Sequence, residues 1–466
     1  MRWLPLLVAM LFYSTSAISA DYYCDFSVGG IYYQFIPNKP GEVAVSYDNY
    51  ESGRYGGNYT NYSGYITVPS TVTYNSVTYR VTAVTGHAFY ECSSVTYVSL
   101  PSTITSIGAC AFTDCTSLTG INLPSSLKSI GNSAFNGCIG LNSMDIPSGV
   151  ETIGASAFQD CQNLSSINIP NTVKSIGGSA FAATAWYNNQ PDGMVYAGNV
   201  AYTYKGTMPQ NTEIVLRDGT ISISASAFSG RTGLTSVSIP KSVTSVGSSA
   251  FYACSALNKV IIQDIAAWCN INFDIANSNP LIYAHHLYNK ENVEITSLVI
   301  PNGVTKIGDY AFQNCTDLTS VSIPNSVTSI GYNAFYGCTN LNLVDIPDSA
   351  VDIGTSAFSG TAWYNNMPDG VVYYGKVAYT YKGTMQQNTS IVLKDGTLKI
   401  KDNAFYGCSS LSSIIIPNSV TSIGEKAFQG CSSLASVIIP NSVTSIGEYN
   451  QEIKGETNVE IIPVSA

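Results

Sequence analysis

Residues 311–331 read Ala-Phe-Gln-Asn-Cys-Thr-Asp-Leu-Thr-Ser-Val-Ser-Ile-Pro-Asn-Ser-Val-Thr-Ser-Ile-Gly, and this stretch predicts the fold. Its Ala-Phe pair recurs along the chain, mostly every 23 residues, at Phe89, Phe112, Phe135, Phe158, Phe181, Phe228, Phe251, Phe312, Phe335, Phe358, Phe405 and Phe428. A fixed period in the twenties is typical of a solenoid, because each unit is too small to bury its apolar face except against its neighbours. We therefore predict stacked turns rather than one globular core.

The middle of the repeat predicts a short strand with one solvated face. Val321 and Ile323 alternate with serines, which is the two-residue period of a half-buried strand. A proline then ends the strand, because it lacks a backbone N–H and has a fixed φ. These prolines are Pro101, Pro124, Pro147, Pro170, Pro240, Pro301, Pro324, Pro347, Pro417 and Pro440.

The end of the repeat predicts the return of the chain. Val327 and Ile330 form a second apolar pair on the opposite side, and Gly331 supplies a tight corner before the next Ala-Phe. The phenylalanine fills the hollow between the two sides. At the ~4.8 Å strand spacing the rings should stack into an aromatic column. The predicted fold class is mainly β, with short turns or helical corners.

The repeat resembles the bacterial BspA-like class of leucine-rich repeats, whose unit has the form Cys-x-x-Leu-x-x-Val-x-Ile-Pro-x-x-Val-x-x-Ile-Gly-x-x-Ala-Phe. The likeness covers roughly residues 81–447 and is nearly intact in stretches such as 115–135 and 408–428. Proteins of that class are commonly exported surface proteins associated with adhesion to host matrix proteins, host cells and other bacteria. The resemblance therefore implies a non-enzymatic leucine-rich-repeat solenoid whose strand face serves adhesion.

The chain outside the repeats predicts export and capped ends. Residues 1–20 indicate a secretory signal peptide, with Arg2 before an apolar stretch and small residues at the end. Residues 21–80 lack the repeat and are rich in tyrosine, which indicates an N-terminal β-hairpin cap. The solenoid then spans 81–447, and the tail 448–466 should close it as a further strand or cap. We expect an exported protein, extracellular or at the cell surface of a bacterium.

Three intervals depart from the period and indicate remodelled inserts, at 182–220, 252–296 and 359–397. The first and third are nearly identical in sequence, which a duplication explains without any shared function. The second is the least repetitive and contains Trp268. It is either a binding bulge on one face or a packed loop, and we favour the packed loop.

Composition narrows the partners. The net charge is −10 and the pI about 4.7, whereas nucleic-acid binding draws most of its affinity from clustered Lys and Arg. We expect no nucleic-acid partner. No segment after the predicted signal peptide has the roughly 18 uninterrupted apolar residues of a membrane-spanning helix. The expected partner is an extracellular or host-surface protein, with a glycan as the alternative.

The sequence offers little catalytic or metal-binding chemistry. The three histidines are His87, His285 and His286, and adjacent side chains on an extended segment point to opposite faces. They make a poor metal pair, and no nucleophile motif accompanies them. We therefore expect no catalytic residue, no cofactor and no metal site.

Nine cysteines lie three residues after a corner phenylalanine and should form a column: Cys92, Cys115, Cys138, Cys161, Cys254, Cys315, Cys338, Cys408 and Cys431. Side chains one strand apart place their Cβ atoms near ~4.8 Å, beyond the usual ~3.5–4.5 Å of a disulfide. We predict buried, reduced thiols. Cys24, Cys110 and Cys269 stay possible disulfide partners, with no pair assigned.

The outward face of the predicted strands is the expected binding surface, because its residues are polar in most repeats. The candidate binding residues are Ser99, Asn122, Asp145, Asn168, Ser238, Ser322 and Asp345. At the C-terminal end this column becomes apolar, with Ile415 and Ile438. That patch is a partner site, a dimer contact or a surface covered by the tail, and we favour the tail.

Two other functions stay open. A carbohydrate-binding module requires aromatic side chains exposed in a row, such as those near Trp186, Tyr196, Tyr202 and Tyr204. A surface enzyme is the third hypothesis and requires carboxylates clustered in a cleft, most plausibly beside residues 268–288.

Overall fold

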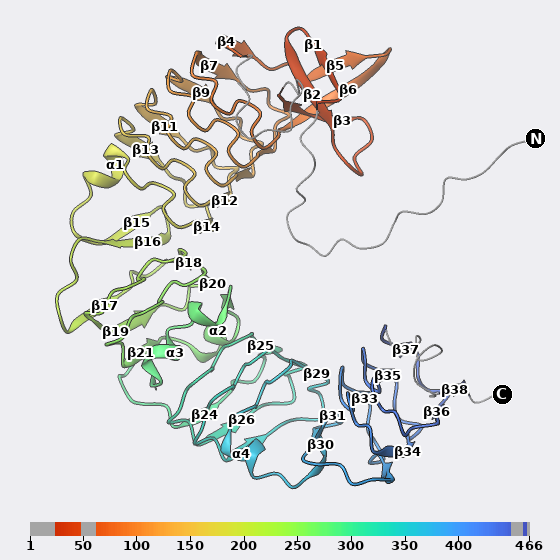
Figure 1. Ribbon diagram of the computed structural model, residues 1–466. Helices are drawn as coiled ribbons and strands as arrows, with labels where there is room; N and C mark the ends of the chain where they lie inside the picture. Colours follow the sequence, from red (N-terminus) through yellow and green to blue (C-terminus); the bar gives the residue numbers. More distant parts are fainter. Residues whose placement is uncertain (1–23, 48–61, 449–459, 464–466) are drawn as a thin grey trace, which may run out of the picture. The chain divides into compact units, whose positions relative to one another are not determined.

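The computed structural model describes residues 24–47, 62–448 and 460–463 (Figure 1). The chain divides into two compact units, one of Met1–Val173 with Ser179–Gln190 and the other of Lys174–Gly178 with Pro191–Ala466. The predicted signal peptide lies outside the described residues. Both units are mainly β and consist of stacked turns, so the predicted fold class is confirmed.

The first unit begins with antiparallel strands. β1 pairs with β2 and β2 with β3, while β5 and β6 form a hairpin and β3 runs parallel to β6. Phe26 stacks on Tyr74 with ring centroids 4.2 Å apart. We propose that these strands cap the first turn of the solenoid. Their bounds are β1 (Phe26–Val28), β2 (Ile31–Phe35), β3 (Glu42–Ser46), β5 (Thr71–Tyr74) and β6 (Val77–Val84).

The turns of the first unit carry two series of parallel strands, one on each side of the turn. The strands that precede the prolines are β4 (Gly64–Thr67), β7 (Val95–Ser99), β9 (Gly120–Asn122), β11 (Ser143–Asp145) and β13 (Ser166–Asn168). The return strands are β8 (Ser106–Ile107), β10 (Ser129–Ile130) and β12 (Thr152–Ile153), and the unit ends at helix α1 (Ala185–Asn188).

The second unit repeats this plan over more turns. The series before the proline positions comprises β17 (Thr212–Val215), β19 (Leu234–Ile239), β21 (Lys259–Ile262), β23 (Leu287–Tyr288), β24 (Ser297–Val299), β26 (Ser320–Ser322), β28 (Leu343–Asp345), β32 (Thr389–Val392), β34 (Leu411–Ile415) and β36 (Ser436–Ile439). The return series comprises β14 (Ser175–Ile176), β18 (Ser222–Ile223), β20 (Ser245–Val246), β22 (Asn272–Phe273), β25 (Lys306–Ile307), β27 (Ser329–Ile330), β29 (Asp352–Ile353), β33 (Lys399–Ile400), β35 (Ser422–Ile423) and β37 (Ser445–Ile446).

The corner phenylalanines stack as predicted. Within an uninterrupted run of repeats, neighbouring rings lie 4.8–5.7 Å apart with interplanar angles of 2–13°. That spacing falls in the range of offset aromatic pairs. All twelve rings are buried. Each column is therefore hydrophobic core, shared between one turn and the next.

A third hydrogen-bond ladder runs beside each column of rings. The backbone N–H of Phe112 donates to the carbonyl of Ala134 in the next repeat at 2.7 Å, and Phe335 donates to Ala357 in the same way. The corner closes because the residues two before and two after every corner phenylalanine have positive φ. An L-residue in this region costs roughly 1–2 kcal/mol, so the hydrogen bonds and the buried ring must offset that strain.

The repeat glycine is required by close contact rather than by its φ. A Cβ placed on Gly354 would collide with the backbone N of Tyr332, in the preceding turn. A Cβ on Gly131 would lie 2.6 Å from Ala109 N. The tight corner predicted at this glycine is present, and glycine is needed there because the backbones of two neighbouring turns approach closely.

The cysteine column is buried and unpaired in disulfides, as predicted. Eight of its nine members are buried and Cys408 is half-buried, and all twelve cysteines of the chain are free thiols. Six of the nine thiols donate to the carbonyl of the phenylalanine one repeat earlier, as from Cys338 Sγ to Phe312 O at 3.0 Å. Cys24, Cys110 and Cys269 form no disulfide either.

The duplicated inserts form a short helix followed by a hairpin. The helices are capped by the buried hydroxyls of Thr184 and Thr361. Each hairpin is antiparallel, and its second strand joins the return series. These elements are α1, then β15 (Gly193–Ala197) with β16 (Val200–Lys205), and α4 (Ala362–Asn365), then β30 (Gly370–Tyr374) with β31 (Val377–Lys382).

The insert at 252–296 packs against the core, as we favoured. Trp268 is buried, and its indole N–H donates to Ala311 O at 2.7 Å. The Asn279 amide donates to Tyr310 O at 2.7 Å. The insert contains α2 (Ile265–Cys269), η1 (Ala276–Ser278) and α3 (Leu281–Ala284).

The described part of the tail contributes a closing strand at the edge of the sheet. β38 (Glu460–Pro463) pairs parallel with β36 and so extends the sheet at its edge. Ile415 and Ile438 keep 59% and 61% of their surface exposed. The strand at 460–463 lies at the edge of the sheet and leaves its face open. Almost all of the rest of the tail lies outside the described residues, so its covering of the patch stays a prediction.

Truncation of one ring should strongly destabilise the fold. Phe335 is fully buried between Phe312 and Phe358, so Phe335→Ala should lower the free energy of unfolding by about 3–5 kcal/mol. The next residue, Tyr336, is 42% exposed, and Tyr336→Ala should change it by less than about 0.5 kcal/mol. Denaturant unfolding of both variants measures the contrast, and equal losses would contradict the stacked-core description.

The buried thiols predict a loss of stability at alkaline pH. Burial raises the pKa of Cys161 to about 12 and that of Cys254 to about 11, from 9.0. The folded state therefore holds these protons more tightly, and the free energy of unfolding should fall as the pH rises above 9, by at most about 1.4 kcal/mol per pH unit for each thiol. Urea unfolding between pH 8 and 10 measures this slope. A double Cys161→Ser, Cys254→Ser variant should show a shallower slope, and an unchanged slope would contradict the assignment.

Candidate functional site

The predicted binding residues divide between the two units. Four belong to the first unit, where Ser99 lies opposite Asn122 and Asp145 opposite Asn168 in parallel register. The other three, Ser238, Ser322 and Asp345, belong to the second unit. Each occupies the outward position that the two-residue period predicted.

Asn122 has a structural partner within its own unit. Its amide nitrogen donates to Leu100 O at 2.9 Å, and its carbonyl oxygen accepts from Leu100 N at 2.7 Å. These bonds satisfy both backbone groups of Leu100, where the strand before it has ended. Asn122 therefore holds two turns together, a role that the outward position alone did not reveal.

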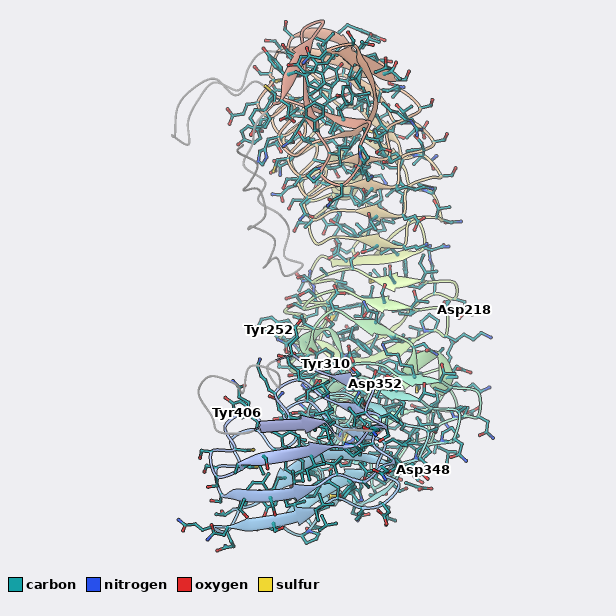
Figure 2. The ribbon with its side chains drawn as sticks, turned by 90° about the vertical axis from the view of Figure 1, so that its right-hand side faces the viewer. Asp218, Tyr252, Tyr310, Asp348, Asp352 and Tyr406 are labelled. Carbon is teal, nitrogen blue, oxygen red and sulfur yellow. The ribbon has the colours of Figure 1, made fainter. Side chains whose placement is uncertain are left out.

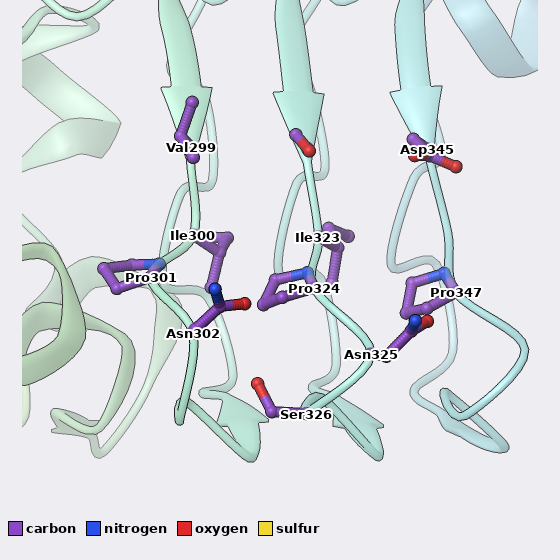
Figure 3. A pocket seen from close by; sticks show the side chains of 11 residues that line it. Val299, Ile300, Pro301, Asn302, Ile323, Pro324, Asn325, Ser326, Asp345 and Pro347 are labelled. Atoms are coloured by element: carbon purple, nitrogen blue, oxygen red, sulfur yellow. The ribbon is translucent and has the colours of Figure 1, made fainter.

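In the second unit, Ser322 and Asp345 line an open hollow of about 510 Å³ where β24, β26 and β28 end (Figure 3). Figure 3 shows three prolines in a row along it, one for each turn, with Asn302 and Asn325 beside them. The lining consists of Val299, Ile300, Pro301, Asn302, Ser322, Ile323, Pro324, Asn325, Ser326, Asp345 and Pro347. The repeat thus builds one recess from three equivalent strand ends.

A second hollow of about 240 Å³ continues from the first onto the strand face, and it shares Ser322 and Asp345. On its floor Ser320 Oγ donates to Ser297 Oγ at 2.7 Å. Leu343 borders it with 67% of its surface exposed. The two hollows together offer amide and hydroxyl groups that both donate and accept, apolar side chains, and the carboxylate of Asp345.

The outward column of the second unit becomes apolar beyond this recess. Val392 lies opposite Ile415 on paired strands, and Ile438 occupies the same position one turn later. Their exposed fractions are 68%, 59% and 61%. An aligned series of exposed aliphatic residues of this kind is typical of interaction surfaces.

Two edges of the second unit differ in chemistry (Figure 2). Tyr252 and Tyr406 follow corner phenylalanines and are more than half exposed. Figure 2 shows them on the edge opposite Asp218 and Asp348. Asp348 pairs with Lys376 at 3.2 Å.

The aromatic row required for carbohydrate binding does not form at the first duplicated insert. Tyr202 and Tyr204 are buried, and the Tyr196 hydroxyl accepts from Arg217 N at 3.1 Å beneath the Arg217 guanidinium. Sequence composition missed this because a hairpin strand buries alternate side chains. A different pair, Tyr65 and Tyr97, stacks at 4.9 Å on the strand face of the first unit.

The two neighbouring histidines of the second insert contact different groups, and one of them meets two carboxylates. His285 Nδ1 lies 3.1 Å from Asn314 O. His286 Nδ1 lies 2.7 Å from Glu294 Oε1 and 2.8 Å from Asp317 Oδ2. The sequence analysis missed this cluster, because Asp317 follows 31 residues after His286 and only the stacking of turns joins them.

Among the described residues, no helix has the length and apolar character needed to cross a membrane.

Comparison with protein families gives one match. The family model described as BspA type Leucine rich repeat region matches residues 82–189, 200–277, 282–379 and 375–461. A comparison with curated proteins gave no match.

Solved structures of bacterial leucine-rich repeat proteins are also similar. A leucine-rich repeat protein from Bacteroides ovatus ATCC 8483 is 23% identical, with 95% of this chain and 100% of that chain covered and a TM-score of 0.26. A leucine rich cell surface protein from Faecalibacterium prausnitzii A2-165 is 23% identical, with coverages of 93% and 97% and a TM-score of 0.28. The T. pallidum Leucine Rich Repeat protein is 22% identical, with coverages of 53% and 85% and a TM-score of 0.30.

The contrast between two asparagines tests the structural role of the outward column. Asn122→Ala should lower the free energy of unfolding by about 1–2 kcal/mol, because Leu100 N–H and C=O both lose a partner. Asn168 occupies the same position two turns later and is exposed, so Asn168→Ala should cost less than about 0.5 kcal/mol. Denaturant titrations of both variants measure the two free energies of unfolding. Equal losses in the two variants would contradict a structural role for the Asn122 amide.

Proposed function

We propose a binding function for this chain, which belongs to the BspA-type leucine-rich repeat family. The members of this family are protein-binding repeat scaffolds. The protein is an exported adhesion protein of a bacterial surface. It binds an extracellular or host-surface protein through the strand face of its second unit, and it performs no catalysis.

The observation that supports this site most directly is the combination of a recess with an apolar column. The hollow around Ser322 and Asp345 supplies hydrogen-bonding groups, while Val392, Ile415 and Ile438 supply exposed aliphatic surface at the same outward position. Stable protein interfaces combine a desolvated apolar centre with a polar rim. Both parts lie within one unit of the chain.

The recess alone is too small for a stable protein interface, so a protein partner would also contact the neighbouring strands. A stable interface buries about 800 Å² on each partner, so a ligand that reaches only three strand ends covers too little. The lining of the larger hollow contains aliphatic, proline, amide and hydroxyl side chains and no aromatic ring. That lining suits a polypeptide surface better than the stacking of a sugar ring.

The charge of the site favours a basic group on the partner. Asp345 is exposed, and it is the one charged residue among the eleven that line the larger hollow. The net charge of −10 steers cationic surfaces towards the protein at low ionic strength. We therefore expect the bound protein to place a lysine or arginine near Asp345.

Glycan binding is the second candidate, and one observation favours it. Tyr65 is 64% exposed and stacks with Tyr97 at an interplanar angle of 11°, which gives the first unit a flat aromatic surface. Such a surface suits the apolar face of a sugar. This site is separate from the recess of the second unit, so variants distinguish the two.

The binding assay uses the purified full chain on arrays of matrix proteins and glycans. Ser322→Lys with Asp345→Lys should weaken protein binding at least tenfold, because the recess is filled and its charge reversed. The matched variant Asp145→Lys with Asn168→Lys changes the strand face of the first unit and should bind like the wild type.

Equal protein binding by all three forms would contradict the proposed site. Glycan binding that is lost in Tyr65→Ala, without any protein binding, would replace the proposal with the second candidate.

A further inference from the structure

We propose that His286, Glu294 and Asp317 bind a divalent metal ion of the zinc class. The nitrogen and oxygen atoms that these residues offer all lie within 4.8 Å of one another. Both carboxylates approach the same imidazole atom, His286 Nδ1, at 2.7 and 2.8 Å. One imidazole nitrogen and two carboxylate oxygens are a ligand set that Zn²⁺ accepts in proteins.

The backbone fixes the position of Glu294. Residues 287–295 form a tight hairpin, in which Tyr288 and Glu294 are bridged in antiparallel register and Ile295 N donates to Leu287 O at 2.8 Å. The Asn289 side chain caps the turn by accepting from Val293 N at 2.9 Å. Glu294 is thus held beside the strand that follows His286.

The other two residues are positioned as firmly. The carbonyl of His286 accepts from Val260 N at 3.1 Å, which fixes its backbone to β21. Thr316 N donates to His285 O at 3.2 Å and brings the loop of Asp317 beside the insert. The three ligands come from three segments whose backbones are already hydrogen-bonded, so metal binding would require little reorganisation of the chain.

The repeat itself singles out Asp317. Nine repeats contain the column cysteine. The residue two positions after that cysteine is acidic in one of them, at Asp317. The other eight residues are Ser94, Ser117, Gly140, Asn163, Ala256, Asn340, Ser410 and Ser433. Stacking of turns therefore does not require a carboxylate at this position, and the acid occurs where the insert supplies His286 and Glu294.

The two carboxylates favour a positive charge between them. They approach one imidazole nitrogen and repel each other, and a bound divalent cation offsets that repulsion. The side chains of His286, Glu294 and Asp317 are 36%, 31% and 38% exposed, so water or a group from a partner can complete the coordination. The imidazole ligand disfavours Ca²⁺ and Mg²⁺, which prefer oxygen.

The geometry requires only small adjustments to accept the ion. Zinc binds imidazole nitrogen and carboxylate oxygen at about 2.0–2.2 Å, which places tetrahedral ligand atoms about 3.4 Å apart. The present separations from Nδ1 are shorter, at 2.7 and 2.8 Å. To admit the ion, the two half-exposed carboxylates would have to move away from Nδ1 by roughly 0.6 Å.

Titration of the untagged, chelator-treated full chain with Zn²⁺, followed by calorimetry, tests the site. The wild type should bind one ion saturably, and His286→Gln, Glu294→Gln and Asp317→Ser should each weaken binding at least tenfold. Serine occupies the Asp317 position in other repeats, so that variant should fold normally. The control is Glu291→Gln in the same hairpin, which removes a carboxylate that pairs with Lys290 and should leave binding unchanged.

Co²⁺ as a second probe reports the ligands directly, because its visible absorption depends on the coordinating atoms. A spectrum without thiolate-to-metal charge transfer, lost in Asp317→Ser, is the expected result. Absence of saturable binding, equal binding by Asp317→Ser and the wild type, or binding that disappears only in Cys24→Ser or Cys110→Ser would overturn the proposal.

Discussion

Within an uninterrupted run of repeats, the hydrogen bond from the corner phenylalanine N–H to the alanine carbonyl of the next repeat is the interaction on which the rest of the structure depends. It sets the distance between turns, and that distance permits the rings to stack and the cysteine thiol to reach the phenylalanine carbonyl one repeat earlier. The same closeness excludes a Cβ at Gly354. It also requires left-handed residues on both sides of the phenylalanine, such as Asn333 and Gly337.

This dependence explains which features could be predicted from the sequence. Residues that repeat every 23 positions report contacts between identical turns, so the phenylalanine column, the proline ends and the buried thiols follow from periodicity alone. Periodicity alone does not give the reason for the repeat glycine, because a close backbone contact and a positive φ both favour glycine. The exposed patch at Ile415 follows from the outward position in the repeat, whereas the edge pairing of the tail strand with β36 does not.

The candidate sites were harder to predict for a related reason. An outward position in the repeat indicates that Asn122 is accessible, but it does not indicate that the Asn122 amide holds the backbone of Leu100. The cluster at His286 joins residues from an insert and from the next repeat, and a search for local motifs sees neither carboxylate. One signal was present in the sequence, the single acid at the Asp317 position of the repeat. Departures from the repeat therefore carry more functional information than the repeat does.

We propose that protein recognition occurs on the strand face of the second unit, around Asp345. Carbodiimide labelling of carboxylates, quantified by mass spectrometry with and without a captured matrix protein, tests this site. We expect Asp345 to become protected on binding, whereas Asp145 in the first unit should be labelled equally in both states. Protection of Asp145 with unchanged labelling of Asp345 would contradict the claim.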